Sequence, residues 1–365
     1  MLNKLGKKNV SMLLILISIP ILLIIFLVVI RSCSSSGSSY SDYEKKMVSA
    51  AEKYFKNMNN LPVGEGDQVS VSLEDLVSKG MIKSPIKALD DKSCTGYVSV
   101  RKNGSLDKNE KNGFYLYIPN LNCEKYNTVH LVDKLKDQIV FEKSGLYEID
   151  DEYVFKGNKV NNYVKFFDTM YRVISVDNNG IIKMVKVDKE RNSYNWDNKY
   201  NSQRKMISGK NDYSDSNLID KLSDLYKKMS DNNKKHIVAY SVCAGNRSEK
   251  YYNIDTINEC SNRVDGQYLS VLNLYDFARA SYDPECNSYN SPSCRNYNYL
   301  YKTIDSTWLL NGNSDNSYGV FYYSFGKIYL SDANNNLSIN IVIYIDGNEL
   351  YTSGDGSFEK PYIIK

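Results

Sequence analysis

The chain has 365 residues, which is enough for two or three domains, and its 46 basic and 43 acidic residues give a formal net charge of +3. Hydrophobic residues make up 42% of the chain and charged residues 24%, a balance typical of a folded protein and not of a disordered one. No long run of Lys or Arg supplies the basic face that nucleic-acid binding requires, so we expect no nucleic-acid partner.

The first element in the chain is an apolar run over residues 12–30, which is interrupted only twice. A helix of this length spans ~28 Å, close to the thickness of a bilayer core. Three lysines precede the run and only Arg31 follows it, and positive residues mark the cytoplasmic side. The pattern therefore predicts a single transmembrane anchor over residues 12–31, a cytoplasmic N-terminus over residues 1–11 and an extracellular remainder that begins with a flexible Ser-rich linker, residues 32–40.

Two alternatives to this anchor stay open. A cleaved signal peptide would have a shorter apolar region of ~7–15 residues and a small-residue cleavage pattern, which is absent here. A lipoprotein would use Cys33, but Arg31 two positions earlier fits lipid attachment poorly.

The cysteines agree with an extracellular location. Apart from Cys33, which we expect to be unpaired, the other six fall into couples that are close in sequence, and an even number in an exported region indicates disulfides. No C-x-x-C motif indicates a metal site, and we expect no metal or other cofactor. The predicted pairs are Cys94–Cys123, Cys243–Cys260 and Cys286–Cys294.

A first extracellular module is predicted over residues 41–128. Its opening helix, residues 41–58, carries apolar side chains at three- and four-residue spacing. Ser72 is placed to cap a second short helix. The runs 97–100 and 114–118 have the strand character of an antiparallel hairpin whose open end the first disulfide would clamp.

This order of membrane segment, amphipathic helix and small antiparallel sheet with a terminal disulfide resembles the type IV pilins and pseudopilins over about residues 10–125. The resemblance implies a pilin-like architecture. Pilins are processed after a Gly and carry Glu at the fifth mature position, whereas cleavage after Gly6 would place Ser11 there.

A connector, residues 129–150, with a brief helix, leads to a distal domain over residues 151–365. Residues 177–180 are predicted to turn between strands at 164–176 and 181–187. We expect these strands to share one sheet with strands at 320–323 and 339–345, because the opening and closing runs are apolar or alternating whereas the middle is polar.

Several runs of the distal domain resemble a domain of unknown function found in surface proteins of gut Firmicutes and their relatives. That family usually has Trp-Arg-Ile where this chain has Tyr171-Arg172-Val173, and Arg-Pro where it has Asn340-Ile341. The resemblance implies an α+β domain with remote C-type-lectin and formylglycine-generating-enzyme character. The runs that carry it are Asn161–Phe166, Tyr171–Ile174, Leu272–Ala278, Asn296–Tyr301, Thr307–Leu310, Gly319–Tyr322, Ser353–Gly356 and Lys360–Tyr362.

Signals of catalysis are weak. No nucleophile elbow, P-loop or HExxH motif occurs. His236 follows two lysines and is interpreted as a solvated residue, while His130 is interpreted as a connector residue. The carboxylates of residues 150–152 have the composition of a glycosidase pair, but chance clusters of acids are common in a chain of this length. We therefore expect a protein without enzyme activity.

Four residues of the distal domain are candidate ligand contacts. Tyr194 and Trp196 lie among amides and carboxylates, where an aromatic ring can stack on a sugar; the alternative is that Trp196 belongs to the core. Asn311 and Asp315, with Asn313 between them, have the alternating spacing of a calcium loop. Asn316 replaces the Gly of such a loop and Tyr322 its final Glu, so an ordinary polar loop is the better interpretation.

These observations predict an α+β protein of a Gram-positive cell surface. It has an N-terminal transmembrane helix, a pilin-like helix with a small antiparallel sheet, and a larger mixed α+β domain. The leading hypothesis is a display or adhesion protein whose distal domain binds an extracellular protein or glycan. The alternatives are a pseudopilin-like component of a secretion or filament assembly, and an enzyme on a degenerate formylglycine-generating-like scaffold.

Overall fold

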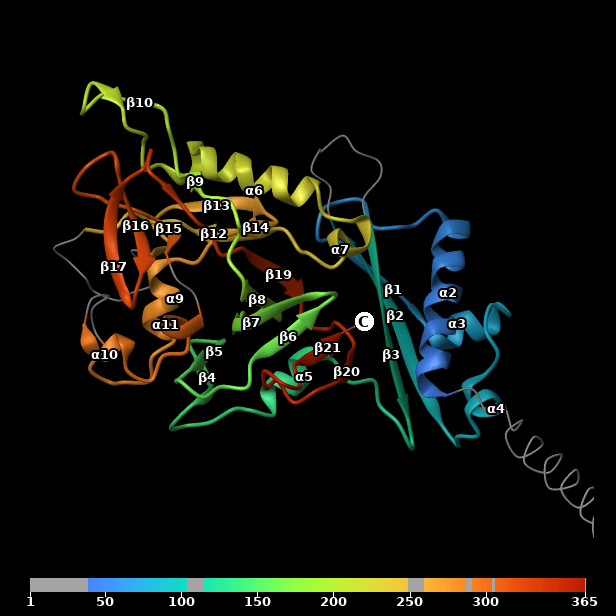
Figure 1. Ribbon diagram of the computed structural model, residues 1–365. Helices are drawn as coiled ribbons and strands as arrows, with labels where there is room; N and C mark the ends of the chain where they lie inside the picture. Colours follow the sequence, from blue (N-terminus) through green and yellow to red (C-terminus); the bar gives the residue numbers. More distant parts are fainter. Residues whose placement is uncertain (1–38, 104–113, 249–258, 287–290, 304–305, 365) are drawn as a thin grey trace, which may run out of the picture.

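A computed structural model describes residues 39–103, 114–248, 259–286, 291–303 and 306–364. The predicted transmembrane segment and Cys33 lie outside these residues. Within them, no helix is both long enough and apolar enough to cross a membrane. Two hydrophobic clusters divide the described chain, a small one formed by a helix on a three-stranded sheet and a large one around a nine-stranded sheet (Figure 1). The protein is therefore α+β, as expected.

The small module is built on α2 (Tyr40–Met58). Ser39 caps this helix, because its hydroxyl accepts a hydrogen bond from the backbone N–H of Asp42 at 3.1 Å. The predicted stripe faces inward up to Phe55, whereas Met58 at the last turn is exposed. The helix covers one face of the sheet formed by β1 (Gln68–Ser72), β2 (Cys94–Asn103) and β3 (Phe114–Cys123) (Figure 1).

Short helices close the small module. α3 (Leu73–Ser78) is capped by Ser72 as predicted, with a 3.0 Å bond from the N–H of Asp75. α4 (Pro85–Leu89) begins at a proline, which fits the first helical turn because that turn leaves its N–H groups unbonded. The β2–β3 hairpin is antiparallel over its full length, with Cys94 directly opposite Cys123.

The large domain begins at α5 (Leu131–Lys136), whose leucines belong to the large cluster. The strands of its principal sheet follow the order β14-β19-β8-β7-β6-β21-β20. The β4–β5 hairpin is attached to this sheet because β5 pairs with β7. The sheet is mixed, because β21 pairs with β6 in parallel and the other pairs are antiparallel. Its strands are β4 (Gly145–Ile149), β5 (Glu152–Lys156), β6 (Tyr163–Phe166), β7 (Thr169–Val176), β8 (Ile181–Lys186), β14 (Leu269–Ser270), β19 (Val342–Asp346), β20 (Tyr351–Ser353) and β21 (Tyr362–Ile364).

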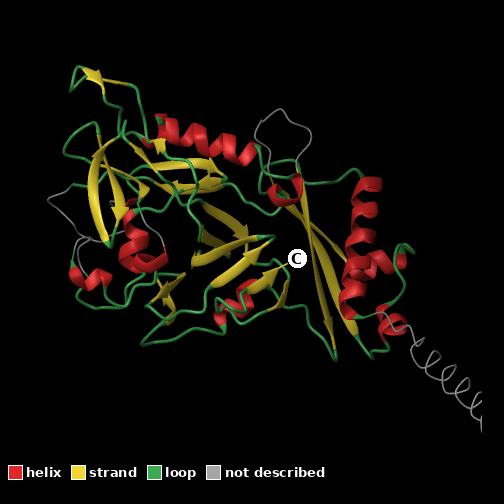
Figure 2. Cartoon of the chain, in the orientation of Figure 1, coloured by secondary structure: helices red, strands yellow, loops and turns green. Residues whose placement is uncertain are grey.

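Smaller sheets and helices lie above the principal sheet and to its left in the view of Figure 2. The short strands are β9 (Tyr194–Asn195), β10 (Tyr200–Asn201), β11 (Met206–Ile207), β12 (Tyr240–Cys243), β13 (Arg263–Gln267), β15 (Thr307–Gly312), β16 (Gly319–Ser324), β17 (Lys327–Asp332) and β18 (Asn336–Leu337). The helices are η1 (Tyr213–Asp215), α6 (Asn217–Lys227), α7 (Asp231–Lys234), α9 (Leu274–Arg279), α10 (Pro292–Arg295) and α11 (Leu300–Thr303).

The sheet prediction for the distal domain is half right. β6, β7, β8 and β19 do share one sheet, and β7 and β8 turn at Asp177–Gly180 as predicted. β16 does not join them, because its two edges are already occupied by β15 and β17. The prediction that residues 320–323 belong to the principal sheet is therefore wrong.

All three predicted disulfides are present. The Cα atoms are 4.1 Å apart in Cys94–Cys123, 4.4 Å in Cys243–Cys260 and 4.4 Å in Cys286–Cys294. The first distance is short because these cysteines are directly opposite each other in the β2–β3 ladder, where non-hydrogen-bonded pairs lie ~4.5 Å apart. Three such bridges are typical of an extracellular or otherwise oxidising compartment.

The two units are joined by a polar seam. Arg101 of β2 forms a 2.8 Å ion pair with the buried carboxylate of Asp346, at the end of β19. The side-chain amide of Asn103 donates to the carbonyl of Lys235 at 2.7 Å. His130 bonds to the carbonyl of Asn348 through Nδ1 and to Asn120 of β3 through Nε2. The small sheet is thus attached to the large domain by its face opposite α2.

Candidate functional site

A cleft of about 650 Å³ opens on the large domain, at one end of its hairpins. This volume is within the ~300–1,000 Å³ of small-molecule sites. Two β-turns, the β12–β13 pair and α9 form its walls. The lining residues are Ile149, Asp150, Glu152, Asp177, Asn178, Asn179, Tyr240, Ser241, Cys243, Cys260, Arg263, Tyr275 and Arg279.

The two turns are fixed by local chemistry. The β4–β5 hairpin closes through Asp150 and Asp151, both with positive φ (50° and 64°), as a two-residue primed turn requires. In the β7–β8 turn, Asp177 Oδ1 accepts the backbone N–H groups of Asn179 and Ile181 at 2.9 and 2.8 Å. The turn therefore presents the exposed side chains of Asn178 and Asn179 on a rigid backbone.

Two tyrosines of the cleft are held in place. The ring of Tyr240 stacks on Tyr344 with centroids 4.3 Å apart, and its hydroxyl donates to Asp177 Oδ2 at 3.0 Å. The guanidinium of Arg279 lies over the ring of Tyr275 at 4.5 Å. Burial raises the pKa of both phenols, so each stays protonated and can donate a hydrogen bond.

A chain of ion pairs links the cleft to the principal sheet. Glu152 pairs with Arg279, whose other guanidinium nitrogen lies 3.9 Å from Asp276. Lys183 of β8 contacts both oxygens of Asp276 at 2.6 and 2.7 Å. Asp276 also accepts the N–H of Asn273 in the capping box of α9. This network ties the helix to the principal sheet and fixes the position of Arg279 in the cleft.

Next to the disulfide that lines the cleft lies a buried carboxyl, Glu259. Only 1% of this residue is exposed, and burial raises its pKa to about 8, although Asn311 and Arg247 both oppose the shift. The side-chain amide of Asn311 donates to Oε1 at 2.7 Å, and Arg247 lies 3.9 Å from Oε2. At neutral pH the folded protein therefore retains the proton of Glu259.

The structure does not bring the four predicted contacts together. Trp196 is fully buried, and its indole N–H donates to the carbonyl of Leu309 at 3.0 Å. Its buried ring offers no face to a sugar, which favours the alternative that it belongs to the core. Tyr194 is half-buried, with Lys221 over its ring at 4.9 Å.

Asn311 and Asp315 differ in their burial and in their hydrogen-bond partners. Asn311 is buried, and its side chain accepts the N–H of Leu274 and donates to Glu259. Asp315 is exposed and accepts a hydrogen bond from Ser248. Asn313 Oδ1, between them, accepts the N–H of Asp315 at 2.8 Å. These contacts match the ordinary polar loop and not a ring of converging calcium ligands.

The interpretation of His236 as solvated is wrong. It is 5% exposed, its Nδ1 lies 2.7 Å from Glu349 Oε1, and its ring packs edge-on against Phe166 and Phe167. The lysines before it end α7, after which the chain turns inward. The lysines that precede His236 in the sequence therefore did not indicate that its side chain is buried.

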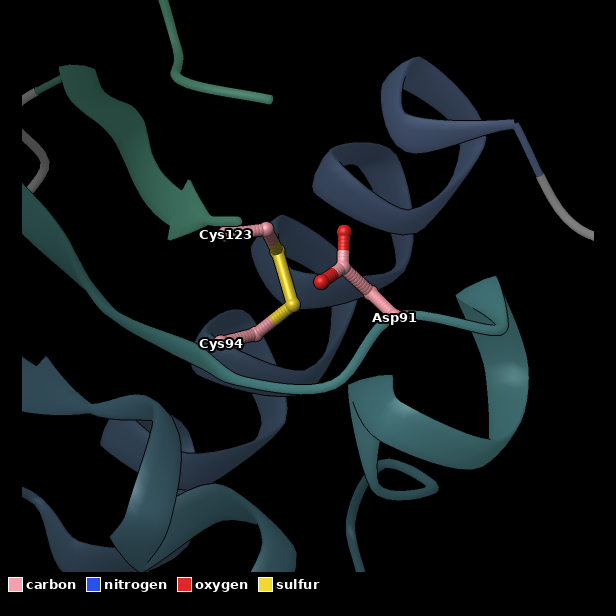
Figure 3. Close-up of side chains that lie close together, drawn as sticks. All are labelled: Asp91, Cys94 and Cys123. Carbon is pink, nitrogen blue, oxygen red and sulfur yellow. A yellow bond between two sulfur atoms is a disulfide. The ribbon is translucent and has the colours of Figure 1, made fainter. Parts of the chain in front are cut away.

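A grouping of possible metal ligands in the described chain consists of Asp91, Cys94 and Cys123 (Figure 3). Its sulfurs are bonded to each other, so neither is the thiolate that a metal requires. Asp91 accepts hydrogen bonds from the hydroxyl of Tyr40 at 2.8 Å and from the N–H of Lys125 at 3.3 Å. The carboxylate has a structural role here, since it ties α2 to the end of the hairpin.

The residues of the cleft were not identified as ligand contacts from the sequence. The sequence presents residues 150–152 as a chance cluster of acids and residues 177–180 as a turn. One sequence signal could have indicated the cleft. Two turns rich in acids and amides lie on neighbouring hairpins, and such turns place polar side chains at one end of a sheet.

Comparison of the chain with protein-family models, with curated proteins and with solved structures finds no match in any of the three.

Proposed function

We propose that the chain is a surface-displayed protein whose distal domain binds an extracellular glycan in the cleft and does not act as an enzyme. It is anchored through residues 12–31, with its N-terminus in the cytoplasm. The observation that carries this proposal is the composition of the cleft wall. Two positioned tyrosines stand among amide, carboxylate, hydroxyl and guanidinium groups.

The balance of groups favours a glycan over a protein ligand. Protein partners usually anchor on buried aliphatic or aromatic side chains, and among the described residues that line the cleft only Ile149 is aliphatic. Sugars combine apolar ring faces with many hydroxyl groups that donate and accept hydrogen bonds. The three carboxylates and two guanidiniums among the described lining residues nearly cancel, so a neutral ligand fits best.

The arrangement of the carboxylates supports binding without catalysis. Asp177 accepts two backbone N–H groups and the hydroxyl of Tyr240, and Glu152 is paired with Arg279. Glycoside hydrolysis requires one carboxyl that donates a proton and one that attacks or activates water. Acids committed to holding turns and neighbours in place are poorly suited to either role.

A pseudopilin-like function is the second candidate. The packing of α2 on one face of a three-stranded antiparallel sheet with a terminal disulfide favours it. Sequencing of the mature N-terminus tests this candidate, since assembly predicts cleavage after Gly6 and display predicts an intact anchor.

The glycan proposal is tested with the full-length protein, purified in mild detergent, on a glycan array. We expect binding that Tyr275→Ala abolishes and Tyr275→Phe retains in part, because the ring contributes more than the hydroxyl. The matched control is Tyr97→Ala, which removes an exposed tyrosine of the small module. Equal loss with both alanine variants, or no binding by the parent protein, would contradict the proposal.

A further inference from the structure

The outer edge of β3 faces a groove of about 390 Å³ at the junction of the two units. The small sheet lies between α2 and the large domain in Figure 1, and residues of both line this groove. Residues 115–119 of β3 line it consecutively. Because successive side chains of a strand point to opposite faces, such a run shows that the groove follows the edge of the strand and not one face of the sheet.

The backbone of β3 has unpaired groups at this edge. The N–H and C=O of Lys102 in β2 bond to Asp67 and Gly66, on the side of β1. Its partner in β3, Tyr115, therefore belongs to a non-hydrogen-bonded pair, so its own N–H and C=O point away from β2, as do those of Tyr117. Within the part of the chain that the structure describes, these groups form no backbone hydrogen bond.

Beyond Pro119 the same edge is already occupied. The N–H of Cys123 bonds to the carbonyl of Tyr126 at 2.7 Å, and the carbonyl of Leu121 accepts the N–H of Thr128 at 2.8 Å. Pro119 lies between the open and the occupied stretches and has no N–H to donate. The edge of β3 thus accepts a strand-like segment a few residues further along, and the stretch that faces the groove is left open.

We infer that the groove binds an extended peptide segment of an extracellular protein, which pairs with the free edge of β3 as an additional strand. In this mode of recognition main-chain hydrogen bonds contribute affinity, and contacts of alternate side chains contribute specificity. The edge is recessed between two walls, a position that suits a single strand better than the whole sheet of a second copy. Among the described residues, none lines both this groove and the glycan cleft, so the two sites are separate.

The wall formed by the large domain favours apolar side chains. Phe167 and Leu350 are half-buried there, beside Leu116 and Ile118 of β3. Phe167 is the first residue of the β6–β7 turn and has a φ of 52°, which bulky residues rarely adopt. Such strain persists only where the surrounding structure holds it, and here it places an aromatic ring on the groove. A peptide paired with β3 directs every second side chain toward this wall.

The wall formed by α2 favours a cationic side chain. Glu52 is exposed on this wall and forms no ion pair with another described residue. Burial, and after it the carboxylate of Glu52, raises the pKa of Tyr117 to about 12, which places this carboxylate near the free edge. Lys45 on the same wall already pairs with Asp42 at 3.0 Å. A Lys or Arg of the peptide that points toward α2 therefore meets an uncompensated negative charge.

The test uses the full-length protein in mild detergent and an array of acetylated, amidated heptapeptides, in which Val, Ile, Leu or Phe alternates with Lys, Arg, Ser or Thr. We expect peptides with a basic residue to bind. Ser49→Trp fills the groove from an exposed position of α2 and should weaken this binding at least about tenfold. The matched control is Asn57→Trp, at an exposed residue of α2 outside the groove, which should leave binding unchanged.

The charge and the strand pairing are tested separately. Glu52→Lys should weaken the binding of Lys-containing peptides at least about fivefold and strengthen that of the same peptides with Glu in place of Lys. Glu142→Lys, at an exposed carboxyl of the large domain outside the groove, should change neither. A bound peptide should also slow amide hydrogen exchange at Tyr115 and Tyr117, because their N–H groups gain partners.

The outcomes decide between the possible occupants. The inference is overturned if no peptide binds the parent more tightly than the Ser49→Trp variant, or if bound peptide leaves exchange in β3 unchanged. A parent protein that is dimeric in analytical ultracentrifugation, and monomeric as the Ser49→Trp variant, would assign the groove to a second copy and also overturn it. Glycan binding that depends on Tyr275 concerns the cleft alone, so the proposed function stands or fails independently of these results.

Discussion

Replacing Glu259 with Gln should make the stability of the protein less dependent on pH. In the unfolded chain a glutamate releases its proton above pH ~4.5, whereas burial holds the folded-state pKa of Glu259 at about 8. The stabilising effect of the bound proton is therefore complete below pH ~4.5 and is lost as pH rises toward 8. Each pKa unit corresponds to ~1.4 kcal/mol, so the loss is on the order of 3–5 kcal/mol, a large part of the ~5–15 kcal/mol of a typical domain.

The assay is urea unfolding with the disulfides intact, at several pH values between 5 and 8. Glutamine resembles the protonated carboxyl and can still accept the bond from Asn311, so the variant should lose less stability over this interval than the parent. The matched control is Glu285→Gln, an exposed carboxyl that also directly precedes a disulfide cysteine. If Glu259→Gln and the parent lose the same free energy between pH 5 and 8, burial does not keep Glu259 protonated and the argument fails.

Three further predictions concern the core, the disulfides and the seam. Trp196→Ala should lower the free energy of unfolding by about 3–5 kcal/mol in denaturant titrations, because the ring is fully buried; a change in glycan binding without loss of stability would instead make it a ligand contact. Replacing Cys94 and Cys123 together by Ser should cost about 2–4 kcal/mol by the same measurement, and non-reducing peptide mapping of the parent should give the three pairs found here. Arg101→Ala leaves the buried carboxylate of Asp346 without its cation and should increase amide hydrogen exchange along β2 and in the β19–β20 loop, whereas exchange in α6 should not change.

The elements that could be predicted from the sequence are those whose partners are close in the chain. The hairpin of β2 and β3, the turn at Asp177–Gly180 and the three disulfides join neighbouring segments, and the stripe of α2 reports a single buried face. Local patterns specify such elements, since turn residues and periodicity act over a few positions.

The cleft could not be predicted in this way. Its walls come from segments near residues 150, 178, 241, 262 and 277, and only the fold brings them together. The placement of β16 failed for a related reason, because a buried strand has the same apolar pattern whichever sheet contains it. Trp196 is a third case: its polar neighbours along the chain left both a sugar contact and a core position open, and contacts with other segments bury the indole.

The seam gives the small module a mechanical role in the proposed function. Leu116 and Ile118 of β3 are buried, yet they belong to neither hydrophobic cluster, and both line a groove that also contains Phe167 and Leu350 of the large domain. Their apolar surface is therefore removed from water mainly by the contact between the two units, and this burial adds to the polar bonds of Arg101 and the other seam residues.

This attachment matters because flexible connections between domains are common and would let the cleft turn freely. Here the segment that leaves β3 passes through His130 and continues into α5, whose first N–H groups bond to the carbonyls of Glu349 and Gly347 at 2.8 and 2.9 Å. The connection is short and bonded on both sides, so the cleft keeps a fixed orientation to α2. In the proposed function, a ligand bound in the cleft would therefore be held by a rigid support that includes α2, as display at a surface requires.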